Sequence, residues 1–222
     1  MRTNKIQIWY RSLIVILGAF ALMYFLTPMR YGASSFFLFY TNLSNLCVVV
    51  YFAIRVFKTI KAKNNNQCKP CNLKIKYTLM FAITITFLIS HFLLNFGMVF
   101  YNDAFNFDFF ILHYVVPIMT IFDWLLFDKK GTMKWSDPFL WLSFPLVYFV
   151  YIMIVCGFFK VQALPTSRYP YPFIDLDTIG IDGMIVNFFV LLFAFILLGF
   201  FFVLIDKLLY KYTSKKAPIK KR

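Results

Sequence analysis

Long apolar runs, separated by short charged breaks, dominate the sequence. Reading the runs against the breaks predicts six spans, at residues 10–28, 35–56, 77–100, 109–127, 138–159 and 184–206. Each run is near or above the roughly 18 apolar residues that a helix needs to cross the hydrocarbon core of a bilayer. We therefore expect an all-α, polytopic membrane protein in which residues 1–222 form a single six-helix transmembrane domain.

The composition agrees with a chain whose main solvent is lipid. Hydrophobic residues make up 61% of the 222 residues and charged residues 14%, whereas a typical soluble domain has about 25% charged residues. No convincing small-residue cleavage site follows the first run, so we interpret it as a retained span and not as a signal peptide.

Positive charge alternates from one connection to the next. The N-terminus, the second and fourth connections and the tail carry all 23 Lys and Arg residues except Arg30, Lys160 and Arg168. The positive-inside rule then predicts that both termini are cytoplasmic. The net charge of +14 is explained by this topology, with or without specific binding to anionic headgroups on the basic side, and we do not expect binding to nucleic acid.

Polar side chains inside the spans are the candidate functional residues, because each costs free energy in lipid unless it meets a partner or water. The densest polar patch is Tyr40-Thr41-Asn42-Leu43-Ser44-Asn45 in the second span. Thr41, Ser44 and Asn45 share one face of that helix by three- and four-residue spacing. This face is predicted to look into the bundle.

Two histidines add a base to these hydroxyl and amide groups. His91 and Asn95 lie four residues apart on the third span, and His113 lies near the start of the fourth, with Pro117 a turn later. The topology brings Thr41, His91 and His113 to the same, outer half of the membrane. A neutral imidazole can take a proton from a hydroxyl and make it a nucleophile toward an ester. The alternative for Ser44, Asn45 and Asn95 is ordinary hydrogen bonding between helices.

Two further groups are given structural roles. Asp123 lies ten residues after His113 and much deeper, so we expect it to pair with Arg55 near the cytoplasmic edge. Cys68 and Cys71 have the spacing of half a zinc site, but no second pair or nearby His completes it, so an incidental or palmitoylated pair is favoured over metal.

The chain resembles the androgen-induced-gene family of membrane threonine hydrolases, and more closely its small six-span bacterial relatives. Three segments carry the resemblance: Phe39 to Asn45 in the second span, His113 to Pro117 leading to Asp123-Trp124 in the fourth, and Tyr171-Pro172-Phe173-Ile174-Asp175 in the outer loop. The resemblance implies a Thr nucleophile and a His within the membrane, acting on fatty acid esters of hydroxy fatty acids. By position these roles fall on Thr41 and His113. The implied location is the plasma membrane of a bacterium.

The leading hypothesis is therefore a lipid ester hydrolase in which Thr41 attacks and His113 serves as base and then as acid. Further candidate supporting or substrate-binding residues are Asn42, Ser44, Asn45, His91, Asn95, Tyr171 and Asp175. Of these, His91, Asn95 or Asn45 is expected to supply oxyanion donors, and Asp175 to orient His113. No metal or organic cofactor is implied. The alternatives are a lipid or small-molecule binding protein or transporter that uses the same pocket without reacting, and a purely structural role.

Overall fold

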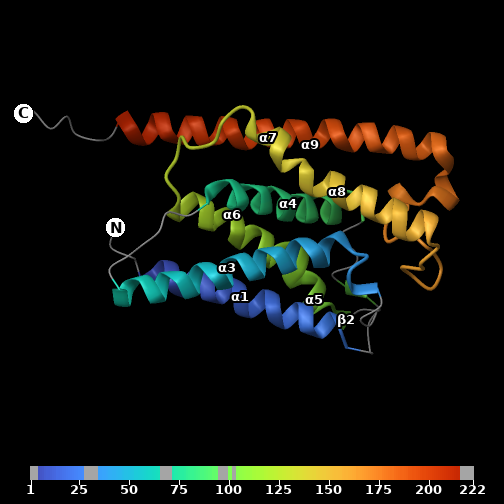
Figure 1. Ribbon diagram of the computed structural model, residues 1–222, viewed down its shortest axis with the longest axis horizontal. Coiled ribbons are helices and arrows are strands. Elements are labelled where there is room, and N and C mark those ends of the chain that lie inside the picture. The colour runs from blue at the N-terminus through green and yellow to red at the C-terminus, as the bar shows by residue number, and fades with distance from the viewer. Residues whose placement is uncertain (1–4, 28–34, 66–71, 95–99, 102–103, 216–222) are drawn as a thin grey trace, which may run out of the picture.

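A computed structural model of the protein describes residues 5–27, 35–65, 72–94, 100–101 and 104–215. Its helices run side by side along one long axis (Figure 1). In chain order the elements are α1 (Lys5–Phe25), α3 (Tyr40–Asn65), α4 (Leu73–Phe92), β1 (Phe100–Tyr101), β2 (Ala104–Phe105), α5 (Phe107–Phe110), the π-helix η2 (Ile111–Val115), α6 (Val116–Phe127), α7 (Asp137–Trp141), α8 (Ser143–Ile152), the π-helix η3 (Met153–Phe158), the 3₁₀ turn η4 (Pro172–Ile174) and α9 (Leu176–Lys215).

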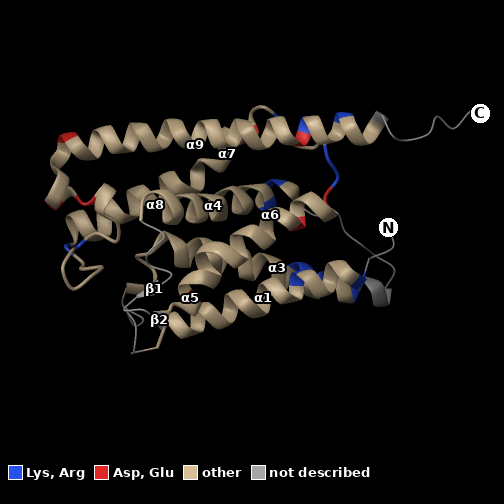
Figure 2. Ribbon diagram, turned by 180° about the vertical axis from the view of Figure 1, so that it is seen from behind, with Lys and Arg blue, Asp and Glu red and all other residues tan. Residues whose placement is uncertain are grey.

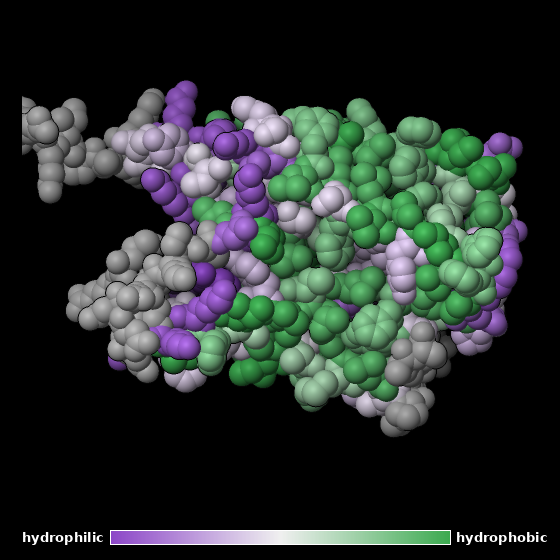
Figure 3. All heavy atoms as spheres, viewed as in Figure 1, coloured by the Kyte–Doolittle hydropathy of each residue, from purple (hydrophilic) through white to green (hydrophobic). Residues whose placement is uncertain are grey.

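Six helical segments within the described residues are long and apolar enough to cross a membrane, as the sequence predicts. They are Lys5–Phe25, Tyr40–Lys61, Leu73–Phe92, Phe107–Phe127, Asp137–Phe158 and Leu176–Ser214. On the face that Figure 3 shows, a broad hydrophobic band crosses the middle of the molecule, and hydrophilic side chains gather at the two ends. The protein is therefore an all-α integral membrane protein. α1 begins and α9 ends at the same end of the bundle (Figure 1).

Several predicted boundaries are wrong by a few residues or more. The third helix ends at Phe92, and Phe100–Tyr101 pairs with Ala104–Phe105 as a short antiparallel hairpin, although a span was predicted to continue to residue 100. The last helix begins at Leu176 and has 40 residues, about 60 Å at 1.5 Å per residue. It therefore extends well beyond the predicted span of 184–206, and its first turns bend at Gly180, whose φ of 67° suits glycine.

α4 is the central helix of the bundle. Of its membrane-spanning window 61% is buried, against 17% for α9, which lies at the edge. On one side of α4, the helices α1, α3 and α6 pack together with η2, and on the other side lie α7, α8 and α9. Gly18 allows α1 and α3 to approach closely, because a Cβ there would lie 2.5 Å from a methyl group of Val49. The core consequently has two halves that meet at α4.

An ionic network joins three helices inside one end of the bundle. Asp123 on α6 accepts hydrogen bonds from the Arg11 guanidinium on α1 at 2.7 and 3.0 Å and from the Lys76 ammonium on α4 at 2.5 Å. Lys76 also contacts Asp128 at 2.6 Å. We call Arg11, Lys76, Asp123 and Asp128 the ionic network. Asp123 has no exposed surface, so two cations neutralise a carboxylate that lipid or core alone would not tolerate.

The predicted pairing of Asp123 with Arg55 is therefore wrong. Arg11 lies on the same stripe of α1 as the buried Ile14 and Gly18, so its side chain points inward toward α6. The buried Nε of Arg55, by contrast, has no hydrogen-bond partner among the described residues. Residue spacing gives the depth of a side chain along its helix, but it does not give the direction in which the side chain points around that helix.

Replacing Asp123 by Asn is expected to lower the free energy of unfolding by about 3 kcal/mol, because the two buried cations Arg11 and Lys76 then share one carboxylate, that of Asp128, among the described residues. Unfolding of the purified protein in detergent measures this. The matched control is Asp177→Asn, which breaks the more exposed Arg168–Asp177 pair and should change stability little. Equal losses in the two variants would contradict a structural role for the network.

Candidate functional site

Thr41 lies in the first turn of α3, where backbone N–H groups have no partner within the helix. Its N–H donates instead to the hydroxyl of Tyr171 at 3.3 Å, and the Tyr171 hydroxyl lies 3.5 Å from Thr41 Oγ1. Tyr171 reaches this position from the segment just before η4, so a residue 130 positions away in the sequence covers the start of α3. Both side chains are 7% exposed. The hydroxyl of Thr41 is thus held inside the bundle.

The carbonyl of Thr41 is fixed by two side chains of the same helix. Ser44 Oγ donates to it at 3.1 Å and Asn45 Nδ2 at 2.8 Å. Asn45 Nδ2 also donates to the carbonyl of Leu112 at 3.0 Å, which joins α3 to η2. Ser44 lies 2.8 Å from the hydroxyl of Thr86 on α4. Because its amide hydrogens are already donated to carbonyls, Asn45 positions Thr41 and is not free to serve as an oxyanion donor.

His113 lies in the π-helix η2, four residues before Pro117. Proline has no N–H to donate to the carbonyl of residue 113, so the regular α-helical hydrogen bond is missing there and the helix widens locally. His113 Nδ1 lies 2.9 Å from the carbonyl oxygen of Phe109, and the imidazole stacks on the Phe109 ring at 3.8 Å. These two contacts fix both the position and the rotation of the imidazole.

The structure brings Thr41 and His113 together. Thr41 Oγ1 lies 3.1 Å from His113 Nε2. A carbonyl oxygen only accepts hydrogen bonds, so the contact with Phe109 assigns the proton of neutral His113 to Nδ1. Nε2 then presents its lone pair to Thr41, and the threonine hydroxyl is the donor. This is the geometry that proton removal from Thr41 requires.

Two further candidate residues, His91 and Asn42, are bonded to groups other than Thr41 and His113. His91 stacks on Phe87 and its Nδ1 is 3.5 Å from the hydroxyl of Tyr114, so it is not beside Thr41. Asn42 donates its amide to the carbonyl of Phe36 at 3.1 Å. Asn95 and the pair Cys68 and Cys71 lie outside the described residues.

Asp175 does not orient His113, contrary to the prediction. Its carboxylate accepts hydrogen bonds from Ser167 Oγ at 2.8 Å and from the N–H of Asp177 at 3.0 Å, so it holds the 160–175 segment against the start of α9. The physical reason is local. An Asp two residues before an N–H at a helix start finds that donor more easily than a ring inside the bundle. The carbonyl of Phe109 takes the orienting role instead.

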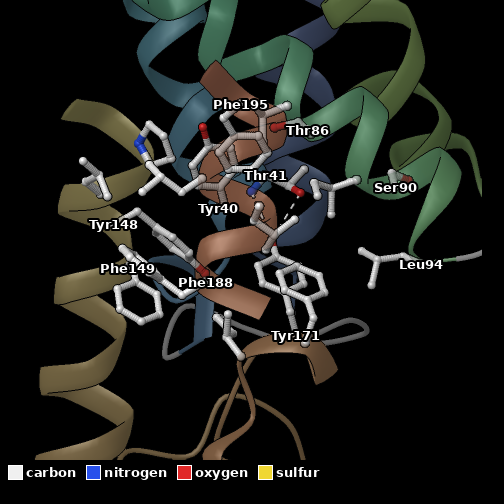
Figure 4. Close-up of a pocket in the computed structure, with 18 of the residues that line it drawn as sticks. Tyr40, Thr41, Thr86, Ser90, Leu94, Tyr148, Phe149, Tyr171, Phe188 and Phe195 are labelled. Carbon is white, nitrogen blue, oxygen red and sulfur yellow. Dashed lines mark hydrogen bonds between the residues drawn. The ribbon is translucent and has the colours of Figure 1, made fainter. Parts of the chain in front are cut away.

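A pocket opens beside Thr41 and His113, between α4, α8 and α9. Figure 4 shows Thr41 and Tyr171 at its wall, Tyr148 and Phe149 of α8 on one side and Ser90 and Leu94 on the other. Its cavity volume is about 90 Å³, several times the space that one water molecule needs. The lining residues are Tyr40, Thr41, Ile85, Thr86, Ile89, Ser90, Leu94, His113, Leu142, Pro145, Leu146, Tyr148, Phe149, Tyr171, Phe173, Ile174, Phe188, Leu191, Leu192 and Phe195.

Sequence reasoning missed three contributors to the site. Phe109 could have been found, because it lies one helical turn before His113, where a carbonyl can meet the ring. Thr86 and Tyr148 carried no signal beyond being polar residues on apolar helices. Tyr148 donates its hydroxyl to the carbonyl of Leu38 at 2.8 Å and so supports the chain just before α3.

Among the described residues, no group of three or more His, Cys, Asp or Glu side chains is placed to hold a metal ion. The fold and the site thus define a six-span membrane protein with a buried Thr–His pair facing an apolar pocket. Comparison of the chain with protein-family models, with curated proteins and with solved structures gave no match.

The 160–175 segment, which Asp175 holds against the start of α9, is expected to loosen in acid. Burial raises the pKa of Asp175, but hydrogen bonds from Thr178, Ser167 and Asp177 outweigh burial and lower it below its ordinary value. A lowered folded pKa contributes stability that is present above the unfolded pKa of about 3.9 and is lost as the pH falls through the folded value. Hydrogen exchange of residues 160–175, corrected for intrinsic rates, should therefore accelerate on acidification below about pH 4.

In Asp175→Asn the same segment is expected to exchange faster at neutral pH and to lose this pH dependence. Asp182→Asn is the control, because Asp182 lies exposed on the first turns of α9. A pH response that survives in Asp175→Asn would assign it to another group.

Proposed function

We propose that the protein is an intramembrane hydrolase of lipid esters, with Thr41 as nucleophile and His113 as general base. The observation that carries the proposal is the 3.1 Å contact between Thr41 Oγ1 and the lone pair of His113 Nε2, at the wall of an apolar pocket. An ordinary interhelical hydrogen bond would not need the imidazole to be fixed at both nitrogens. The resemblance to membrane threonine hydrolases assigns the same two residues these roles.

The reaction follows from this arrangement. His113 Nε2 takes the hydroxyl proton as Thr41 Oγ1 bonds to the ester carbonyl carbon, which becomes tetrahedral. The intermediate collapses, and the leaving alkoxide takes the proton from His113 and departs as an alcohol. Water then attacks the acyl–threonine ester with His113 again accepting a proton, and a fatty acid leaves as Thr41 regains its hydrogen. One ester and one water give one acid and one alcohol.

We assign the oxyanion donor to Tyr171. Its hydroxyl accepts the N–H of Thr41, which leaves its own proton to donate. The oxyanion is the former carbonyl oxygen, which stays bonded to the carbon that Thr41 Oγ1 attacks. The Tyr171 hydroxyl lies 3.5 Å from Thr41 Oγ1 and therefore close to that carbon's substituents. Donation to a charge that develops only in the transition state accelerates the reaction.

The charge pattern supports a membrane orientation for this enzyme. We propose that the end where α1 begins and α9 ends is cytoplasmic, with the basic residues there against anionic headgroups of a bacterial plasma membrane. In Figure 2 the ribbon is blue, marking Lys and Arg, in the last turns of α9 and at the same end of the neighbouring helices. The Thr41–His113 pair lies toward the opposite end, which assigns the site to the extracytoplasmic half of the bilayer.

Labelling by a fluorophosphonate probe tests the nucleophile. Thr41→Ala is expected to abolish labelling of the purified protein, and His113→Ala to slow it by about 10²-fold or more, because the base is lost. Thr41→Ser should retain labelling through its hydroxyl. Thr120→Ala is the matched control, since Thr120 is buried but donates only to the carbonyl of Val116 in its own helix. Labelling that persists in Thr41→Ala would exclude this nucleophile, and no labelling of any form would favour a binding protein.

Tyr171→Phe tests the oxyanion donor. We expect kcat for an uncharged p-nitrophenyl acyl ester to fall about 10²-fold or more, with a smaller change in KM, because the lost bond acts in the transition state. Tyr169→Phe is the control, because the Tyr169 hydroxyl is also buried in the same segment and has no hydrogen-bond partner among the described residues. Equal effects of the two substitutions would contradict the assignment.

A further inference from the structure

Among the described residues, the wall of the pocket carries no charged Lys, Arg or Asp side chain that could neutralise a charged ligand. The lining is made of aliphatic and aromatic side chains together with a few hydroxyl groups and His113. A buried carboxylate or phosphate costs many kcal/mol unless a cation and hydrogen bonds compensate it. We therefore expect the charge of a ligand to decide whether the pocket can bind it.

Charged residues lie near the two ends of the bundle and leave the middle neutral (Figure 2). At the end nearest the site, Arg168 is already paired with Asp177, and Asp175 is bonded within its own segment. Lys160 is exposed at the start of the 160–175 segment and does not line the pocket. None of these groups offers a cation to a ligand held beside Thr41.

Several hydroxyl groups of the lining are bonded within the protein, but the buried hydroxyl of Tyr40, which also lines the pocket, has no hydrogen-bond partner among the described residues. Tyr148 donates to the carbonyl of Leu38, and Thr86 is bonded to Ser44 at 2.8 Å. Thr41 faces His113, and Tyr171 is needed at the reacting carbonyl. An anionic group would thus find few free hydroxyl donors and no cation, whereas an ester needs only one donor at its carbonyl oxygen.

The uncharged lining of the pocket is long enough to enclose the substituent on one side of the ester bond. On α9 the lining side chains run from Phe188 to Phe195, about 10 Å at 1.5 Å per residue. On α4, which runs antiparallel to α9, they include Ile85, Thr86, Ile89 and Ser90. Thr41 and His113 lie on the wall that faces these two helices, so substituents near the ester carbonyl lie against apolar side chains.

We infer that the substrates are uncharged esters, such as acylglycerols or esters of long-chain alcohols, and that lipids with an ionised carboxylate or phosphate close to the ester are rejected. This inference rests on the proposed function. It separates the chain from what its family resemblance implies, because a fatty acid ester of a hydroxy fatty acid carries a free carboxylate. The discriminating feature is the neutral lining between α4, α8 and α9.

A matched pair of substrates tests it on the full-length protein in lipid nanodiscs. One is a fatty acid ester of a hydroxy fatty acid with its ester a few carbons from the free carboxylate, and the other is its methyl ester, which differs only in charge. At neutral pH, kcat/KM for cleavage of the internal ester should be about tenfold or more higher for the methyl ester. A smaller ratio, or faster hydrolysis of the free acid, overturns the inference.

Binding to Thr41→Ala keeps this test independent of catalysis. Displacement of a pyrene-labelled acylglycerol should again favour the methyl ester over the free acid by about tenfold or more. If wild type neither hydrolyses an ester nor reacts with a fluorophosphonate, the proposed function fails, and this binding ratio still decides the inference. If hydrolysis depends on Thr41 but shows no charge preference, the inference alone fails.

A charge added to the lining should weaken the preference. Leu192 lines the pocket, whereas the adjacent Phe193 is 63% exposed on the outside of α9. Leu192→Lys, with its fold checked by thermal unfolding, is expected to reduce the ratio at least about threefold, because it supplies the missing cation. Phe193→Lys carries the same charge outside the pocket and should leave the ratio unchanged. An unchanged ratio in folded Leu192→Lys contradicts the inference.

Discussion

A polar group inside this bundle is stabilised only by a partner within the protein, because hydrocarbon offers none. That constraint accounts for the two polar centres of the molecule. At one end, Asp123 is held by Arg11 and Lys76 from two other helices. Near the other end, the backbone and hydroxyl groups of Thr41 are bonded to Tyr171, Ser44, Asn45 and His113. Apolar side chains pack the rest of the helices.

The two centres stabilise the bundle in different ways. The ionic network joins α1, α4 and α6 through charges that are costly to bury and costlier to separate, so it fixes how these helices rotate relative to one another. The site around Thr41 uses neutral hydrogen bonds, each worth less. The site also contains a local departure from regular α-helix at η2, where Pro117 lacks the N–H that would bond to the carbonyl of His113.

The proposed chemistry and the proposed selectivity have a common origin in the absence of charge among the described residues around Thr41. A carboxylate usually orients the base in Ser–His–Asp sites. Here a backbone carbonyl, that of Phe109, fixes the imidazole without placing a second charge in the membrane. A neutral dyad in a neutral pocket favours a neutral ester, so an acid released by the reaction would carry a charge that the pocket does not stabilise. In the proposed reaction, release of the acid would be assisted by the same neutral lining that admits the ester.

The sequence alone determined the six membrane-crossing helices, because length and hydropathy decide whether a segment enters a bilayer regardless of its neighbours. It also pointed to Thr41 and His113, since polar side chains in apolar helices are few and their depth follows from the 1.5 Å rise. Only the tertiary structure decided the partners. Asp123 pairs with Arg11 and not with Arg55, and Asp175 accepts a hydrogen bond from Ser167 in its own segment. Such pairing depends on how each helix is rotated and bent against the others, and residue spacing along one helix does not specify this.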